Sequence, residues 1–111
     1  MKTSESSVHS LEGIVGFILG NLDEALTIDK LSQRCLLSKY HFHRQFRAYT
    51  GVNVGRFVQL ARLKRASLQL VFNRQRRITD IAMDAGFDFP ESFTRAFRRV
   101  YGQSPTQFMR K

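Results

Sequence analysis

Acidic residues are absent from nearly half of this 111-residue chain. Between Asp29 and Asp80 lie 50 residues without one carboxylate side chain, and the whole chain carries 18 basic against 9 acidic residues, a formal net charge of +9. The acid-free tract holds twelve basic residues: Lys30, Arg34, Lys39, Arg44, Arg47, Arg56, Arg62, Lys64, Arg65, Arg74, Arg76 and Arg77. Because like charges repel and lower the stability of a compact state, a polyanionic partner is the simplest reason to keep them. A solvated basic surface is the alternative.

Cysteine and long apolar runs are also scarce. Cys35 is the sole cysteine of the sequence, so no disulfide can form within the chain, and a reducing cytoplasm suits it. The first seven residues lack the apolar core of a signal peptide. The most apolar stretch, residues 14–19, is far shorter than a membrane span. These features favour a cytoplasmic protein that does not enter a membrane.

No segment alternates between apolar and polar residues as a half-buried strand would, whereas apolar residues recur at helical spacing along most of the chain. The sequence predicts an all-α fold with seven helices. The first begins near Val8 and carries apolar positions as far as Leu22. The others are expected at about 27–35, 38–49, 54–72, 78–85, 90–101 and 104–108, with caps such as Ser38 and a first-turn Pro90.

The second half of the chain repeats the first. Six residues are identical to the residue 51 positions later in the chain: Phe42 and Phe93, Arg44 and Arg95, Phe46 and Phe97, Arg47 and Arg98, Gly51 and Gly102, Phe57 and Phe108. Upstream of these residues the offset is 50, so one residue has been added in the turn of the second copy. Each copy has the pattern of a helix-turn-helix, one supersecondary unit used twice. We expect an N-terminal helix-turn-helix subdomain at 8–53, a linker helix at 54–73 and a C-terminal helix-turn-helix subdomain at 74–110.

The turn inside each pair differs between the copies. In the second, Ala82 and Gly86 suit a tight turn, because Ala allows close helix approach and Gly accepts a positive φ. The first copy has Leu36 where the second has Gly86, and a branched side chain resists that backbone region. The sequence therefore predicts a distorted or differently shaped first turn.

The second helix of each pair carries two stripes. One stripe is apolar and is expected to face the core: Phe42, Phe46 and Tyr49 in the first copy, and Phe93, Phe97 and Val100 in the second. The opposite stripe follows i, i+3, i+4, i+7 and contains Tyr40, His43, Arg44 and Arg47, then Glu91, Thr94, Arg95 and Arg98. Arginine can fork onto guanine, glutamate can accept from the cytosine amino group, and threonine or an aromatic ring can touch the thymine methyl. The stripes predict sequence-specific binding of double-stranded DNA, although an ordinary charged outer face has the same composition.

The length of the linker helix supports this interpretation. A helix over 54–72 would be about 28 Å long, and successive major-groove faces on one side of B-DNA lie roughly 34 Å apart. Two reading helices on such a linker could enter adjacent major grooves. Because the two stripes differ, the bound site should be asymmetric.

The chain resembles the DNA-binding domain of AraC/XylS-family transcription regulators over almost its whole length. The most specific matches are Ile81-Ala82, Gly86-Phe87, the run from Phe93 to Arg98, Tyr101-Gly102-Gln103-Ser104-Pro105 and Phe108, supported by Ser38, His41-Phe42, Arg44, Phe46, Thr50-Gly51, Ala61-Arg62-Leu63 and Ala66. The resemblance implies two helix-turn-helix units joined by a long helix and bound to about twenty base pairs. It also implies contact with RNA polymerase, usually to activate transcription, and often a sensor or dimerisation domain preceding the DNA-binding one. Whether the chain is a free-standing regulator or a fragment stays open.

The resemblance also assigns roles by position. Base reading falls on Tyr40, His43 and Arg44 in the first unit and on Glu91, Ser92 and Arg95 in the second, where the stripe adds Thr94. Candidates for phosphate contacts are Ser38, Lys39, Arg47, Arg98 and Thr106. Pro90, Leu36 and Gln69 depart from the family pattern, and Pro90 is expected to reduce the number of bases that the second helix reads.

Two other classes of function fit less well. An enzyme is not expected, because Gly51 and Gly55 lack the lysine and the preceding strand of a phosphate-binding loop, and neither a catalytic residue nor a cofactor is predicted. A metal site at Cys35, His41 and His43 is conceivable, but the two histidines lie two positions apart and so point apart on a helix. A cationic module that binds membrane surfaces or proteins is the main alternative. Both apolar stripes are needed for packing, however, which leaves none for a membrane.

Overall fold

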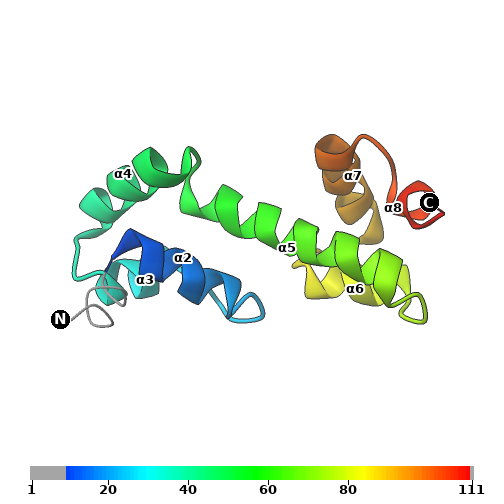
Figure 1. Cartoon of the computed structure of the whole chain (residues 1–111), viewed down its shortest axis with the longest axis horizontal. Helices are drawn as coiled ribbons and strands as arrows, with labels where there is room; N and C mark the ends of the chain where they lie inside the picture. The colour runs from blue at the N-terminus through cyan, green and yellow to red at the C-terminus, as the bar shows by residue number, and fades with distance from the viewer. Residues whose placement is uncertain (1–9, 111) are drawn as a thin grey trace. The chain divides into compact units, whose positions relative to one another are not determined.

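The computed structural model describes residues 10–110, and all the regular structure in that range is helical. Its seven helices are α2 (Leu11–Leu19), α3 (Ile28–Arg34), α4 (Lys39–Thr50), α5 (Val54–Phe72), α6 (Ile78–Asp84), α7 (Pro90–Tyr101) and α8 (Pro105–Met109) (Figure 1). The predicted all-α class is confirmed. Within residues 10–110, none of the helices combines the length and the apolar character needed to cross a membrane.

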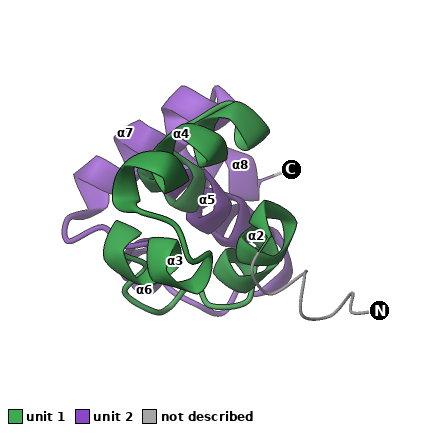
Figure 2. Cartoon of the chain, turned by 90° about the vertical axis from the view of Figure 1, so that its left-hand side faces the viewer, with its two compact units in different colours: residues 1–58 green, residues 59–111 purple. Residues whose placement is uncertain are grey.

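The chain forms two compact units that divide inside α5, the first ending at Val58 and the second beginning at Gln59 (Figure 2). In the first unit α4 packs on α2 and α3, and in the second α7 packs on α6 and α8. The predicted linker segment 54–73 thus contributes residues to both units. The predicted start of the first subdomain, at Val8, lies outside the described residues.

The first helix is shorter than predicted. Ser10 begins α2 by accepting a hydrogen bond from the Gly13 amide at 3.0 Å, and the helix ends at Leu19. At that end the Asn21 amide donates to the Ile18 carbonyl, only three residues back, and the Asn21 side chain donates to the Phe17 carbonyl at 2.8 Å. These bonds satisfy carbonyls that would otherwise continue the helix toward Leu22.

Two phenylalanines of α4 form the centre of the first unit. Phe42 and Phe46 are fully buried, as are Ile14 and Ile18 of α2 and Leu31 of α3. The Phe46 ring meets the ring of Phe57 edge to face, with centroids 5.4 Å apart. The apolar stripe of the first copy therefore turns inward at these two positions, as predicted.

The second unit repeats this arrangement with more aromatic contact. Phe93 and Phe97 of α7 are fully buried in a core with Leu63, Leu70 and Ile81. The Phe97 ring also packs on those of Tyr101 and Phe108, with centroids 4.6 and 5.3 Å away. Phe97 thereby joins α7 to α8 at the centre of this unit.

The predicted burial of Tyr49 and Val100 is wrong. Tyr49 is 56% exposed and Val100 36% exposed. Each lies in the last turn of its helix, where the stripe continues inward at i+4 instead of i+3. Tyr101 reaches the core four residues after Phe97, and the Thr50 hydroxyl donates to the Phe46 carbonyl four residues before it.

The predicted difference between the two helix-turn-helix turns is also wrong in its main part. Leu36 adopts φ 59°, and Gly86 adopts φ 92°, so both residues take the left-handed conformation. The next amides make the same bond, from Leu37 to the Ser32 carbonyl and from Phe87 to the Ala82 carbonyl, each 3.0 Å long. The same hydrogen bond therefore gives both turns the same backbone shape, and Leu36 adopts a left-handed conformation that is strained for a branched side chain. The added residue of the second copy lies after this turn. Ser38, the N-cap of α4, is two positions after Leu36, whereas Phe89, the residue before α7, is three positions after Gly86.

Candidate nucleic-acid interface

The N-terminus of α4 is fixed by Ser38. Its hydroxyl oxygen accepts from the His41 amide at 3.1 Å and lies 2.9 Å from His41 Nδ1. At the other end Gly51, at φ 89°, closes the helix with a bond from its amide to the Arg47 carbonyl. The helix is thus capped at both ends, which holds its outer face in a defined register.

That outer face carries the predicted base-reading residues of the first unit. Tyr40, His43, Arg44 and Arg47 are all exposed, opposite the buried Phe42 and Phe46. Arg44 Nη1 donates to the Tyr40 hydroxyl oxygen at 3.1 Å, and its guanidinium carbon lies 5.6 Å from the Tyr40 ring centroid. The structure therefore brings Tyr40 and Arg44 together as a pair in solvent.

Lys39, a predicted phosphate contact, has an acidic neighbour. Its ammonium lies 3.0 Å from Asp29 Oδ1 of α3, and both side chains are exposed. Exposed pairs of this kind contribute little to stability. A phosphate can therefore compete with Asp29 for Lys39 at low energetic cost.

The outer face of α7 has a different composition. Phe89 precedes the helix without a side-chain cap, and Pro90 occupies its first turn. An open hollow on this face is lined by the following residues: Pro90, Glu91, Thr94, Arg95 and Arg98. Ser92 and Thr94 are half-buried, while Glu91, Arg95 and Arg98 are exposed. Four predicted residues of α7 therefore share one surface, namely Glu91, Thr94, Arg95 and Arg98, and the charged side chains are the most accessible.

Thr106 lies on α8, which begins with a capping box. The Ser104 hydroxyl accepts from the Gln107 amide at 3.2 Å, and the Ser104 amide donates to Gln107 Oε1 at 2.9 Å. These bonds use the polar groups of the first turn and leave Thr106 exposed. The Thr106 side chain is therefore accessible for the predicted phosphate contact.

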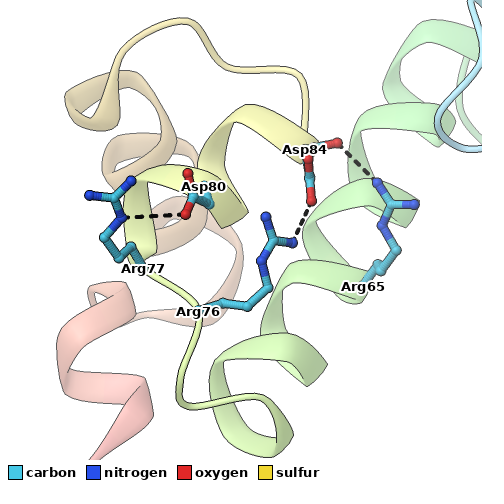
Figure 3. A network of polar contacts seen from close by, with 5 residues as sticks. All are labelled: Arg65, Arg76, Arg77, Asp80 and Asp84. Atoms are coloured by element: carbon cyan, nitrogen blue, oxygen red, sulfur yellow. Dashed lines mark hydrogen bonds and ion pairs between the residues drawn. The ribbon is translucent and has the colours of Figure 1, made fainter.

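Several arginines of the acid-free tract make polar contacts within the second unit and do not belong to the outer face of α4 or α7 (Figure 3). Arg65 donates to the backbone carbonyl of Asp84 at 2.9 Å, and Arg76 donates to the carboxylate of the same residue. That hydrogen bond to Asp84 raises the pKa of Arg76. Arg77 pairs with Asp80 at 3.4 Å. These contacts tie α5, α6 and the loop between them together.

Two further arginines have structural partners. Arg74 donates to the Met109 carbonyl at 2.9 Å, which fastens the α5–α6 loop to the end of α8. In the first unit the guanidinium of Arg34 lies 3.8 Å from the centroid of the Phe17 ring. None of these structural roles was predicted from composition. For Arg76 and Arg77 the sequence holds a signal, because Asp80 and Asp84 lie one helical turn apart directly after the tract.

Cys35 packs as a small apolar residue. It is buried at the end of α3, and burial raises the pKa of its thiol, with a smaller opposing effect from Arg34. His41 and His43 are exposed, whereas Cys35 is buried. Among residues 10–110, no cluster of three or more His, Cys, Asp or Glu side chains is arranged to hold a metal ion.

The chain is similar to known DNA-binding regulators. A family model described as a helix-turn-helix domain matches residues 31–111. Right origin-binding protein of Escherichia coli K12 is 34% identical over 91 residues, which cover 82% of this chain and 31% of that protein, so the chain spans about a third of its length. Regulatory protein SoxS of the same organism is 31% identical over 98 residues, 88% of this chain and 91% of SoxS.

Solved structures agree. The DNA-binding domain of AdpA, a global transcriptional factor solved in complex with a target DNA, superposes with a TM-score of 0.79 at 27% identity and covers 89% of this chain and 88% of that one. These similarities agree with the fold, in which two helix-turn-helix units each bury a pair of phenylalanines. The chain belongs to the AraC-type helix-turn-helix family of DNA-binding transcription regulators.

Proposed function

We propose that this chain regulates transcription by binding one asymmetric site in double-stranded DNA, with α4 and α7 reading adjacent major grooves. One observation carries the proposal. Each unit buries two phenylalanines of one helix and exposes arginines on the opposite side of that helix. Such a helix can enter a groove without giving up core packing.

The roles proposed for the residues are those that the family resemblance gives them, with Thr94 added from its place in the stripe. Base reading is assigned to Tyr40, His43, Arg44, Glu91, Ser92, Thr94 and Arg95. Phosphate contacts are assigned to Ser38, Lys39, Arg47, Arg98 and Thr106. Phosphate contacts set the register and most of the affinity, and base contacts set the preference for sequence.

Partners belong to the same proposal. Membership of the family favours contact with RNA polymerase and activation of transcription in the bacterial cytoplasm. SoxS, which is named as a regulatory protein, matches this chain over 91% of its own length, which supports a regulatory role for a domain of this size. Right origin-binding protein is more than twice as long as this chain, and a sensor or dimerisation domain attached to this one is the corresponding expectation.

Selection of bound duplexes from a random pool tests the proposal. We expect one asymmetric consensus, with two half-sites roughly one helical turn apart. A palindromic consensus, or no enrichment, contradicts the proposal. Anionic lipid vesicles at the same ionic strength serve as the competing partner, and preferential binding to the vesicles would favour the membrane-surface alternative.

Variants of two arginines of α7 then distinguish a base contact from a phosphate contact. Arg95→Ala should cost about 1–3 kcal/mol on the selected site and relax the preference at one base position. Arg98→Ala should weaken binding to all sequences alike, because a phosphate contact carries no sequence information. Titration of both variants against the selected site and a scrambled duplex is the measurement. A sequence-selective loss in Arg98→Ala would reverse the two assignments.

A further inference from the structure

The hydrogen bond between Arg44 and Tyr40 changes what the first unit can offer to a base. Arg44 Nη1 donates to the Tyr40 oxygen at 3.1 Å, four residues earlier on α4. A phenol can accept one hydrogen bond and donate another, so the Tyr40 hydrogen remains available. Arginine has five N–H groups and uses one of them here. The pair therefore presents donors to solvent and no free acceptor of comparable strength.

The equivalent positions of the second unit are Glu91 and Arg95. A glutamate four residues before an arginine usually pairs with it on a helix. In the described part of the chain, however, no ion pair joins these two side chains, and both line the hollow on α7. A carboxylate accepts only and a guanidinium donates only. This unit therefore presents an acceptor beside donors.

The two surfaces match different base steps. In the major groove, guanine shows acceptors at N7 and O6 and thymine shows O4, while cytosine and adenine show an amino donor. Resting on the function proposed above, we propose that the Tyr40–Arg44 pair reads a base step presenting only acceptors, a guanine beside a second guanine or a thymine. Glu91 and Arg95 read a step in which an amino donor stands beside a guanine. Tyr40 then acts largely through Arg44, as a positioning residue that also donates to the neighbouring base.

Tyr40→Phe removes one hydroxyl and keeps the ring, which makes it a sharp test. Selection from random duplexes should show the guanine preference of the first half-site falling about 3- to 10-fold, the effect of one hydrogen bond, with the second half-site unchanged. Glu91→Gln should relax the second half-site only. Tyr49→Phe is the matched control, because Tyr49 is an exposed tyrosine of the same helix that lies on its opposite side.

Two further measurements test the coupling between the residues. In an Arg44→Ala background, Tyr40→Phe should have a smaller effect on selectivity than in the wild-type chain, because the positioning of Arg44 is already lost and only the donation from the Tyr40 hydroxyl remains. The selected guanine can also be replaced with 7-deazaguanine, which lacks the N7 acceptor. This replacement should weaken DNA binding by the wild-type chain more than it weakens DNA binding by the Tyr40→Phe variant. Circular dichroism melting curves of the variants establish that each one is folded.

The outcomes distinguish this inference from the function beneath it. If the wild-type chain selects no sequence, the proposed function fails. If the wild-type chain is selective but Tyr40→Phe has the same consensus as Tyr49→Phe, the pair is overturned while the function stands. Equal effects of Tyr40→Phe with and without Arg44 would likewise overturn the coupling. A first half-site made only of A·T base pairs would overturn the base assignment, because the proposed step contains at least one guanine.

Discussion

At the scale of single residues, Leu36 is strained without apparent compensation in packing. It holds φ 59°, a region that costs an L-residue roughly 1–2 kcal/mol, and its side chain is 74% exposed. Leu36→Gly should remove this strain but add about 0.4–1 kcal/mol of chain entropy to the unfolded state. We expect a net stabilisation of about 0.5–1 kcal/mol. Urea unfolding with an unchanged slope is the measurement.

The second unit supplies the opposite substitution as a control. Gly86 lies at φ 92°, and an added Cβ would approach Arg62 Nη1 to 3.3 Å. Gly86→Ala should therefore destabilise the chain, whereas Leu36→Gly stabilises it. Equal signs for the two substitutions would mean that the left-handed turn is not the source of the effect.

At the scale of elements, helical period was enough to locate the helices and the buried pairs Phe42–Phe46 and Phe93–Phe97. It was not enough at helix ends, where Tyr49 and Val100 were predicted inside but lie outside. The period also said nothing about which arginines are held by Asp84, because that depends on how α6 meets α5. Sequence likewise identified Gln69 as a departure from the family pattern, but only the structure shows its Oε1 buried without a hydrogen-bond partner.

The site was predicted in composition but not in arrangement. Its residues on α4 and α7 follow from helical spacing, since capped helices fix which side chains share a face. The hydrogen bond between Tyr40 and Arg44, and the lack of an ion pair between the described side chains of Glu91 and Arg95, depend on rotamers that spacing does not determine. Their roles toward DNA remain predictions.

Helix α7 depends on Phe97 for its attachment to the second unit. The ring is fully buried and contacts the rings of Phe93, Tyr101 and Phe108. Phe97→Ala should cost about 3–5 kcal/mol of stability, and Phe46→Ala should have a similar cost in the first unit. Calorimetric melting of both variants is the measurement. An unchanged melting temperature in either variant would show that the core is assigned wrongly.

At the scale of the whole molecule, the net charge of +9 overstates what is available to DNA. Arg76 and Arg77 have carboxylate partners, and Arg74 is bonded to a backbone carbonyl. Lys39 is paired with Asp29, but its side chain stays exposed and the pair is weak. Phosphate contacts should therefore come mainly from the outer faces of α4, α7 and α8 and not from the loop between α5 and α6.

The salt dependence of binding measures this distribution of charge. If roughly six to ten phosphates are neutralised, log K should fall with log salt concentration at a slope of about −5 to −9. Arg47→Gln should reduce the steepness by about 1, because its guanidinium lies on the outer face of α4. Arg76→Gln is the matched control and should leave the slope unchanged, since Asp84 already holds that guanidinium. Titrations of labelled duplex at several salt concentrations give the three slopes. A slope near zero would exclude an electrostatic grip on DNA, and an equal change in both variants would show that the loop arginines bind phosphate after all.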